Sequence, residues 1–240
     1  MPSTKLIVSG ATGFVGGEII RQSLLHPKIS QVIALARSPV AAPEKLPEGG
    51  DSSKLKSVVI QDYAVYPDEV KKEFSGADGC IWTVAITPTK SKSYDFEEVK
   101  RICQTSAIAG LRSMHEAGIA TPFRFLYMSG AAAERDQTKT PKIMAEYSLM
   151  RGETENQLLA LANELGGIEV AVAKPGYITA SGHLTRTAMA AMVKLVSGIP
   201  SIDVVDLVAA MLDQVVRGFE KEPLLPEDLI RIAGTISQTT

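Results

Sequence analysis

The stretch of sequence that decides the fold is Lys5-Leu-Ile-Val-Ser-Gly10-Ala-Thr-Gly13-Phe-Val-Gly16-Gly17-Glu-Ile-Ile20. A short apolar run of strand-forming residues meets glycines spaced G-x-x-G-x-x-G, and a helical pattern follows at once. Gly10 lets the chain turn sharply, Gly13 lets backbone N–H groups approach a phosphate, and Gly16 lets the helix pack against the sheet. The helix N-terminus adds unpaired N–H groups and a partial positive charge. The stretch therefore predicts a strand–turn–helix unit that binds a pyrophosphate.

Apolar runs alternate with helical patterns along the rest of the chain. After the first strand we expect strands at 32–36, 55–61, 79–86, 123–128 and 168–173. We expect helices at 17–25, 68–74, 95–117, 147–165, 188–196, 203–219 and 227–233. Nearly continuous apolar strands separated by helices are typical of an α/β fold, a doubly wound parallel sheet covered on both faces. Ligands of such sheets bind outside the carboxyl ends of the strands.

Length and composition narrow the class of protein. The 240 residues are 45% hydrophobic and carry a net charge of −2, which fits one domain over 1–240 and gives no basic field for nucleic acid. No apolar stretch is long enough to span a membrane, and the N-terminus lacks a signal peptide, so we expect a cytoplasmic protein. The two cysteines, Cys80 and Cys103, lack metal-like spacing, and we expect no metal site.

The residues after the second and third strands bear on the choice of cofactor. An acidic residue after the second strand would accept hydrogen bonds from a free ribose 2′-hydroxyl, whereas an arginine pairs with a 2′-phosphate. The chain has Arg37 followed by Ser38 there, which favours NADP(H) over NAD(H), the alternative being a plain surface arginine. Asp62, which precedes Tyr63, either caps the next turn or hydrogen-bonds the adenine amine.

Six short motifs occur in a fixed order across nearly the whole chain. They are Gly10-Ala-Thr-Gly13-Phe-Val-Gly16, Ala34-Leu-Ala-Arg37-Ser38, Phe125-Leu-Tyr-Met-Ser129, Tyr147-Ser-Leu-Met-Arg151-Gly-Glu-Thr-Glu155, Lys174-Pro-Gly-Tyr-Ile178 and Ile202-Asp-Val-Val-Asp-Leu-Val208. Together they resemble the atypical branch of the short-chain dehydrogenase/reductase superfamily, which includes NmrA-like and epimerase-like NAD(P)-binding proteins. The resemblance implies a Rossmann fold. It also implies a small C-terminal substrate-side lobe, to which 177–200 and 220–240 contribute.

The resemblance also implies a set of cofactor-binding residues. They are Gly10, Thr12, Gly13, Phe14, Val15, Gly16, Arg37, Ser38, Asp62, Tyr63, Val84, Ala85, Arg151, Pro175, Tyr177 and Ile178. In the family the segment after the sixth strand turns under the nicotinamide. A plain strand-ending turn is the alternative for that segment.

The family pairs a catalytic tyrosine with a lysine one helical turn later and adds a hydroxyl residue after the fifth strand. Tyr147 and Arg151 have the i,i+4 spacing that places both on one helix face, and Ser129 fits the hydroxyl position. Arg151 departs from the lysine, and Gly130 stands where related members often carry a second hydroxyl residue. An arginine keeps the charge but does not reproduce a compact ammonium, so cofactor binding is expected more firmly than catalysis. The alternative for Tyr147 is an ordinary aromatic that packs on the neighbouring loop.

These residues support three hypotheses of function. The first is an NADP(H)-dependent oxidoreductase that acts on a small carbonyl or alcohol substrate. The second is a catalytically altered NADP(H) sensor or scaffold of the NmrA-like type, and the third is a redox-neutral isomerase or epimerase on the same fold. A small-molecule substrate is expected and a nucleic-acid or membrane partner is not, whereas a homodimer or a protein partner stays open.

Overall fold

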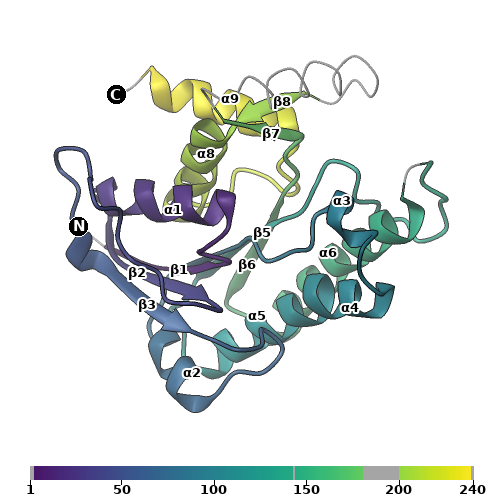
Figure 1. Ribbon diagram of the computed structural model, residues 1–240, viewed down its shortest axis with the longest axis horizontal. Coiled ribbons are helices and arrows are strands. Elements are labelled where there is room, and N and C mark those ends of the chain that lie inside the picture. The colour runs from purple at the N-terminus through teal and green to yellow at the C-terminus, as the bar shows by residue number, and fades with distance from the viewer. Residues whose placement is uncertain (1–2, 143, 181–199, 239–240) are drawn as a thin grey trace.

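The central element of the computed structural model, which describes residues 3–142, 144–180 and 200–238, is a six-stranded parallel sheet (Figure 1). Its strands are β1 (Thr4–Ser9), β2 (Ile29–Ala36), β3 (Leu55–Val59), β4 (Gly79–Trp82), β5 (Phe123–Met128) and β6 (Ile168–Ala173). Their spatial order is β3-β2-β1-β4-β5-β6. The order reverses between β1 and β4, and a ligand crevice forms at such a point outside the carboxyl ends of the strands. The predicted doubly wound α/β fold is confirmed.

Helices cover both faces of the sheet (Figure 1). On one face lie α1 (Phe14–Leu25), α8 (Val204–Arg217) and α9 (Pro226–Ser237), which pack a large cluster of buried residues against β1, β2 and β4. On the other face lie α2 (Asp68–Phe74), α5 (Ser106–Glu116) and α6 (Ala145–Leu165). This face carries the fully buried Trp82 and Phe125. The two apolar layers fix the sheet, and hence the positions of the loops at its carboxyl end.

Two predicted strands end earlier than expected, each at the residue that pairs with the last residue of a neighbouring strand. The strand predicted at 79–86 stops at Trp82, which pairs with Ser9, the last residue of β1. The strand predicted at 55–61 stops at Val59, which pairs with Ala36, the last residue of β2. Once a parallel strand has lost its partner, its backbone groups no longer find a ladder, and the chain is free to form the loops that line the crevice.

The helix predicted at 95–117 is present but interrupted. It consists of α4 (Phe96–Lys100), a π-helical turn (Arg101–Thr105) and α5, and the short α3 (Pro88–Ser91) precedes it. The Asp95 carboxylate caps α4 by accepting from the Glu97 N–H at 2.9 Å. The π-turn buries the consecutive residues Cys103 and Gln104. Such turns insert one extra residue per turn and re-aim the side chains that follow.

A second, two-stranded parallel sheet joins β7 (Tyr177–Thr179) to β8 (Ser201–Asp203). It was not expected from the sequence, because each strand is only three residues long and its partner is remote in the chain. Next to β6, the Leu224 N–H donates to the Val172 carbonyl at 2.8 Å, and the Leu224 carbonyl accepts from the Lys174 N–H at 2.8 Å. The helix predicted at 188–196 and most of the predicted 177–200 segment of the lobe lie outside the described residues.

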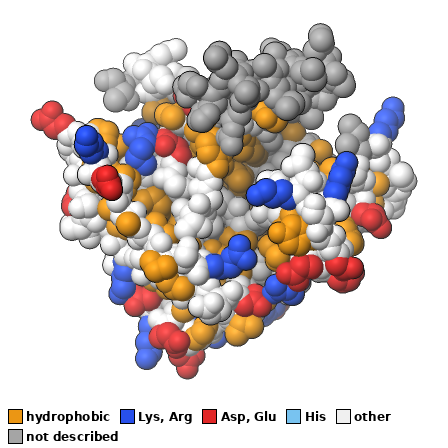
Figure 2. All heavy atoms as spheres, viewed as in Figure 1, with side chains coloured by type: hydrophobic (Ala, Val, Ile, Leu, Met, Phe, Trp, Pro, Cys, Tyr) orange, Lys and Arg blue, Asp and Glu red, His pale blue; other side chains and the backbone are white. Residues whose placement is uncertain are grey.

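The surface carries charges of both signs. In Figure 2 the lysine and arginine side chains are interspersed with aspartate and glutamate side chains, and hydrophobic side chains lie between them. Among the helices of the described ranges, none combines the length and the apolar composition that a bilayer crossing requires.

Candidate cofactor and active site

The glycine turn between β1 and α1 is packed so closely that two of its glycines leave no room for a side chain. Gly10 has φ +83°, and a Cβ there would lie 2.6 Å from the Thr83 Oγ1. A Cβ on Gly16 would lie 2.2 Å from the Gly10 carbonyl oxygen. The Gly13 N–H donates to that same carbonyl at 2.9 Å. The turn is therefore pinned between β1, β4 and α1, at the point where the strand order reverses.

The N-terminus of α1 has the properties that a phosphate group requires. Gly13 is its N-cap and provides no side-chain cap, and the first turn of the helix contains no acidic residue. Thr12, Gly13 and Phe14 are exposed, whereas Val15 and Gly16 face the core. Backbone N–H groups and the positive end of the helix dipole at an exposed, acid-free N-terminus favour an anion. The residues present thus fit the pyrophosphate of a dinucleotide.

Arg37 and Tyr63 lie beside this turn. The Tyr63 hydroxyl donates to the Leu35 carbonyl at 3.0 Å and accepts from the Gly10 N–H at 3.3 Å. Burial raises the pKa of Tyr63 to about 12, and the nearby positive charge of Arg37 opposes this rise. Arg37 and Ser38 are exposed, and within the described residues the Arg37 guanidinium forms no ion pair. The structure therefore places Arg37 and Tyr63, two of the predicted cofactor-binding residues, near Gly10.

Asp62 makes the turn-capping contact that was one of its two predicted roles. Its carboxylate accepts from the Ala64 N–H at 2.9 Å and from the Arg101 guanidinium at 2.8 Å. The backbone hydrogen bond from Ala64, helped by Arg101, lowers the pKa of Asp62. Arg101 lies on the π-turn, so this pair ties the loop after β3 to the long helix.

The other predicted cofactor contacts lie along the same edge of the sheet. The Val84 backbone nitrogen would be 3.3 Å from a Cβ on Gly10, which places the loop of Val84 and Ala85 against the glycine turn. The Pro175 carbonyl accepts from the Ala131 N–H at 3.2 Å, so the turn after β6 meets the loop after β5. Tyr177 and Ile178 belong to β7.

Tyr147 and Arg151 lie one turn apart on α6 and meet the carboxyl ends of the strands. The Tyr147 hydroxyl donates to the Ile86 carbonyl, beyond β4, at 2.9 Å. The Arg151 Nη2 donates to the Met128 carbonyl, at the end of β5, at 2.7 Å. Burial raises the pKa of Tyr147, and the positive charge of Arg151 only partly opposes this effect. Tyr147 therefore holds its proton more firmly than a free tyrosine does.

Arg151 is an unusual side chain because it is charged and buried, and no ion pair joins it to a carboxylate of the described residues. It is only 4% exposed, and its guanidinium lies over the Tyr127 ring, with 4.9 Å between Cζ and the ring centroid. Its Nη1 is buried and has no hydrogen-bond partner among the described residues. A lysine could not fill this space in the same way, since its ammonium is a compact point charge.

Ser129 is held by a residue that the sequence analysis did not single out. Its hydroxyl donates to the Glu155 Oε1 at 2.6 Å. The other Glu155 oxygen, Oε2, lies 2.7 Å from the Arg135 Nε and 3.0 Å from the Lys174 Nζ. Arg135 is further paired with Glu222. The Glu155 side chain is fully buried, so this ion cluster closes the space between α6 and the ends of β5 and β6.

The missed ion cluster had one signal in the sequence. Glu155 follows Tyr147 and Arg151 at intervals of four, so all three residues share one helix face. Its partners Arg135 and Lys174, and Glu222, which pairs with Arg135, come from segments far apart in the chain, which periodicity does not connect. Among the described residues, no hydrogen bond joins Tyr147 to Ser129. Nor do three His, Cys, Asp or Glu side chains gather there in a way that could hold a metal ion.

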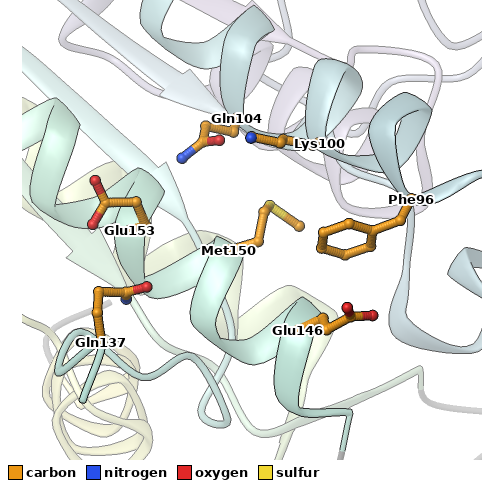
Figure 3. Close-up of a pocket in the computed structure, with 7 residues that line it drawn as sticks. All are labelled: Phe96, Lys100, Gln104, Gln137, Glu146, Met150 and Glu153. Atoms are coloured by element: carbon orange, nitrogen blue, oxygen red, sulfur yellow. The ribbon is translucent and has the colours of Figure 1, made fainter. Parts of the chain in front are cut away.

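A cavity of about 270 Å³ lies on the side of α6 next to α4 and the π-turn (Figure 3). Met150 lies at its centre, between Phe96 on α4 and Glu153 on α6 (Figure 3). The remaining lining residues are Lys100, Gln104, Gln137 and Glu146. Gln137 comes from the loop before α6, and none of the predicted catalytic residues lines the cavity.

Comparisons of the sequence identify a family model and two relatives. Residues 10–215 match the model of a protein family described as NAD(P)H-binding. Protein fmp52-1, mitochondrial, of Aspergillus oryzae is 25% identical over 199 residues, which cover 82% of this chain and 74% of the relative. Leucinostatins biosynthesis cluster protein T of Purpureocillium lilacinum is 31% identical over 77 residues. That second match covers 32% of this chain and only 26% of the relative's length.

Solved structures share the fold at low sequence identity. A short-chain dehydrogenase from Burkholderia cenocepacia in complex with NADP has a TM-score of 0.63 at 17% identity, over 98% of this chain and 92% of that chain. Vestitone reductase from alfalfa has a TM-score of 0.63 at 20% identity, over 91% and 74% of the two chains. MoeE5 in complex with UDP-glucuronic acid and NAD has a TM-score of 0.64 at 14% identity, over 98% and 82%. These likenesses confirm the predicted Rossmann-type fold.

Proposed function

Because the chain belongs to the NAD(P)H-binding family, we propose that it is an NADP(H)-dependent oxidoreductase that interconverts a small carbonyl compound and its alcohol. The observation that carries this proposal is the placement of Tyr147 and Arg151. Both contact backbone carbonyls at the carboxyl end of the sheet, through Ile86 and Met128. A proton-bearing hydroxyl thus lies at the edge where a parallel sheet of this order holds its ligand.

Specific residues would hold the cofactor. The N–H groups at the start of α1 would bind the pyrophosphate, and the exposed Arg37 would pair with the 2′-phosphate that distinguishes NADP from NAD. Val84, Ala85 and the turn from Pro175 to Ile178 would flank the rest of the molecule. Bound NADPH would supply a hydride to the carbonyl carbon.

Tyr147 is the proton donor in this proposal. Burial raises its pKa, so the hydroxyl keeps its proton at neutral pH and turns from the Ile86 carbonyl to the substrate oxygen. The proton moves to that oxygen as the hydride reaches carbon, which yields the neutral alcohol. Arg151 keeps a positive charge beside the tyrosinate that remains.

A second candidate function is an NADP(H) sensor without chemistry. The observation that favours it is the engagement of both hydroxyl protons, on Ile86 for Tyr147 and on Glu155 for Ser129. The buried Arg151 adds to this argument, since its guanidinium is sealed against Tyr127. In that case the glycine turn and Arg37 would serve binding alone.

Cofactor titrations and turnover assays separate these candidates. We expect Arg37→Ala to weaken NADPH binding by about 10-fold to 100-fold and NADH binding far less, because a hydrogen bond between charged groups stabilises by about 1.5–3 kcal/mol. Arg112→Ala, which removes another exposed arginine, on α5, is the control, and we expect it to leave both affinities unchanged. Equal losses for both cofactors would contradict the preference for NADP(H).

The assignment of Tyr147 is tested by NADPH absorbance with a panel of small ketones and aldehydes. We expect Tyr147→Phe to retain NADPH binding and lose at least about 100-fold in kcat, the usual contribution of a positioned proton donor. Full activity in this variant would overturn the catalytic assignment. Tight NADPH binding without turnover would favour the sensor, and product formation without net NADPH consumption would favour the redox-neutral class.

We propose a cytoplasmic location for the protein. The free thiols of Cys80 and Cys103 suit a reducing compartment. One relative carries the word mitochondrial in its name, so cell fractionation with cytoplasmic and mitochondrial markers is the test that separates the two compartments. Light scattering of the purified chain decides between a monomer and a homodimer.

A further inference from the structure

We propose that Glu155 is a positioning residue that makes the Ser129 hydroxyl an acceptor, so that the site favours a hydroxyl-bearing ligand over the corresponding carbonyl. This inference rests on the proposed oxidoreductase function and names which member of the carbonyl–alcohol pair the resting site prefers. Ser129 has one hydroxyl proton, and that proton points at the Glu155 Oε1 across 2.6 Å. A hydrogen bond to a carboxylate is about twice as strong as one between neutral groups.

Glu155 is fixed by its other partners. The oxygen that does not face Ser129 lies between the Arg135 Nε and the Lys174 Nζ, and the side chain is fully buried. Lys174 is itself anchored, because its Nζ donates to the Ala133 carbonyl at 2.9 Å. The carboxylate therefore has three donors around it and cannot turn away from Ser129 without leaving a buried charge unpaired.

The Ser129 backbone is fixed as well. Its N–H donates to the Ala173 carbonyl at 2.8 Å, which continues the pairing of β5 with β6 by one residue. Ser129 is partly exposed, whereas Glu155 behind it is sealed from solvent. The hydroxyl oxygen thus offers only lone pairs to a ligand at the carboxyl end of the sheet.

The lone pairs of the Ser129 oxygen can form a hydrogen bond only with a ligand group that donates a proton. An alcohol can donate its O–H to a lone pair of the Ser129 oxygen. A carbonyl oxygen has no proton to give, so it leaves Ser129 without a ligand partner. A hydroxyl residue that is free to donate could accept from an alcohol or donate to a carbonyl, so it would discriminate little between the two.

The experiment uses the Tyr147→Phe chain saturated with NADP⁺, because this background is expected to bind ligands without turnover and leaves Ser129 as the hydroxyl under test. Cyclohexanol and cyclohexanone, and separately 2-propanol and acetone, are titrated by ligand-observed NMR. We expect each alcohol to bind about tenfold more tightly than its ketone, the ratio that corresponds to one hydrogen bond.

Three further variants in this background isolate Glu155. Glu155→Gln presents an amide N–H to Ser129 and releases its proton, so we expect the alcohol preference to fall to about one or to invert. Ser129→Ala removes the acceptor without touching the ion cluster, and we expect the preference to be lost there too. Glu222→Gln is the matched control, because it weakens the same cluster through Arg135 but leaves Ser129 bonded, and the preference should persist.

The outcomes separate this inference from the proposed function. Equal or tighter ketone binding in the parent, a preference that survives both Glu155→Gln and Ser129→Ala, or no binding of any of the four probes would overturn the inference. If Glu155→Gln does not fold, Ser129→Ala against Glu222→Gln decides. Turnover of the same probes by the chain with Tyr147 intact tests the proposed function separately. An alcohol preference without turnover would support the inference on Glu155 and contradict the oxidoreductase proposal.

Discussion

The two ends of the crevice differ in whether their polar groups are bonded to other groups of the protein. At the glycine turn, the first turn of α1 has no acidic residue, its N-cap provides no side-chain cap, and Arg37 is exposed without an ion pair among the described residues. At the ends of β5 and β6, Glu155 is buried and bonded by Ser129, Arg135 and Lys174. The first region can take a charged ligand without breaking internal bonds. The second must exchange one partner for another, so its chemistry depends on how tightly those partners hold.

The largest expected effect is on the free energy of unfolding, and it tests the buried ion cluster of the second region. We expect Glu155→Ala to lower the free energy of unfolding by about 3–5 kcal/mol, because it leaves Arg135 and Lys174 without their buried anion. The matched change in the first region is Arg101→Ala, which breaks the pair with Asp62, two side chains that are 44% and 43% exposed. There we expect a loss of only about 0–1 kcal/mol.

Urea denaturation measures both changes. A loss of about 1 kcal/mol or less for Glu155→Ala would show that the ion cluster relaxes freely, and the contrast between the two regions would then fail. Arg101 also contacts Glu98, so the result for Arg101→Ala includes that second exposed pair.

The next effect tests the pinned backbone of the first region. We expect Gly16→Ala to cost about 1–3 kcal/mol and to weaken cofactor binding, because its Cβ would lie 2.2 Å from the Gly10 carbonyl oxygen. Gly17→Ala is the neighbouring control, since nothing lies within 4 Å of its Cβ and Gly17 lies inside α1. We expect that change to stabilise the protein by about 0.5–1 kcal/mol.

Thermal unfolding and NADPH titration of the two variants give the comparison. Equal stabilities would mean that the helix shifts away from the turn without cost. In that case the close packing of α1 on β1 would not be what fixes the N–H groups.

The smallest effect at neutral pH concerns Tyr63, whose hydroxyl hydrogen-bonds the backbone of Gly10 and Leu35. We expect Tyr63→Phe to cost about 1 kcal/mol at pH 7 through the lost hydrogen bond to Leu35. Burial raises the pKa of Tyr63 to about 12, above its ordinary value of 10, so the unfolded chain releases this proton first as the pH rises. The wild-type protein therefore loses stability between pH 10 and 12 by up to about 2–3 kcal/mol from this group, and the variant does not.

Chemical denaturation at pH 7, 10 and 11 tests this expectation. The advantage of the wild type over Tyr63→Phe should shrink and then reverse as the pH rises. Tyr94→Phe, at a side chain that is 51% exposed, controls for the loss of a hydroxyl. An advantage that stays constant across this range would contradict the raised pKa.

The contrast between the regions also explains what the sequence could predict. The glycine turn is encoded in consecutive residues, and its three spaced glycines each have a backbone reason, so Gly10 and Gly16 could be assigned from the sequence alone. Tyr147 and Arg151 could be paired for the same reason, since helical spacing by itself places them together. The parallel sheet followed from the alternation of apolar runs with helices.

The ion cluster and the interrupted helix could not be predicted in this way. Arg135, Lys174 and Glu222 look like ordinary solvated charges in the sequence. Only the packing of their loops near α6 brings Arg135 and Lys174 to Glu155, and Glu222 to Arg135. The π-turn shifts the apolar pattern of 95–117 by only a single residue. So small a shift cannot be recognised in a helical pattern from the sequence. β7 and β8 are too short to be recognised before their pairing is known.

The single residue Leu224, which bonds the backbone beside β6, has a consequence for how copies of the chain behave at high concentration. An open sheet offers unpaired N–H and C=O groups along its outermost strands, and these can template fibrils. Leu224 occupies the carboxyl half of one such strand, and Glu169 places a charge on its other half. The opposite outermost strand, β3, carries Lys56, which pairs with Glu73 at 2.5 Å. We expect this one returning residue and these few charges, rather than closure into a barrel, to limit edge-to-edge pairing of the sheet.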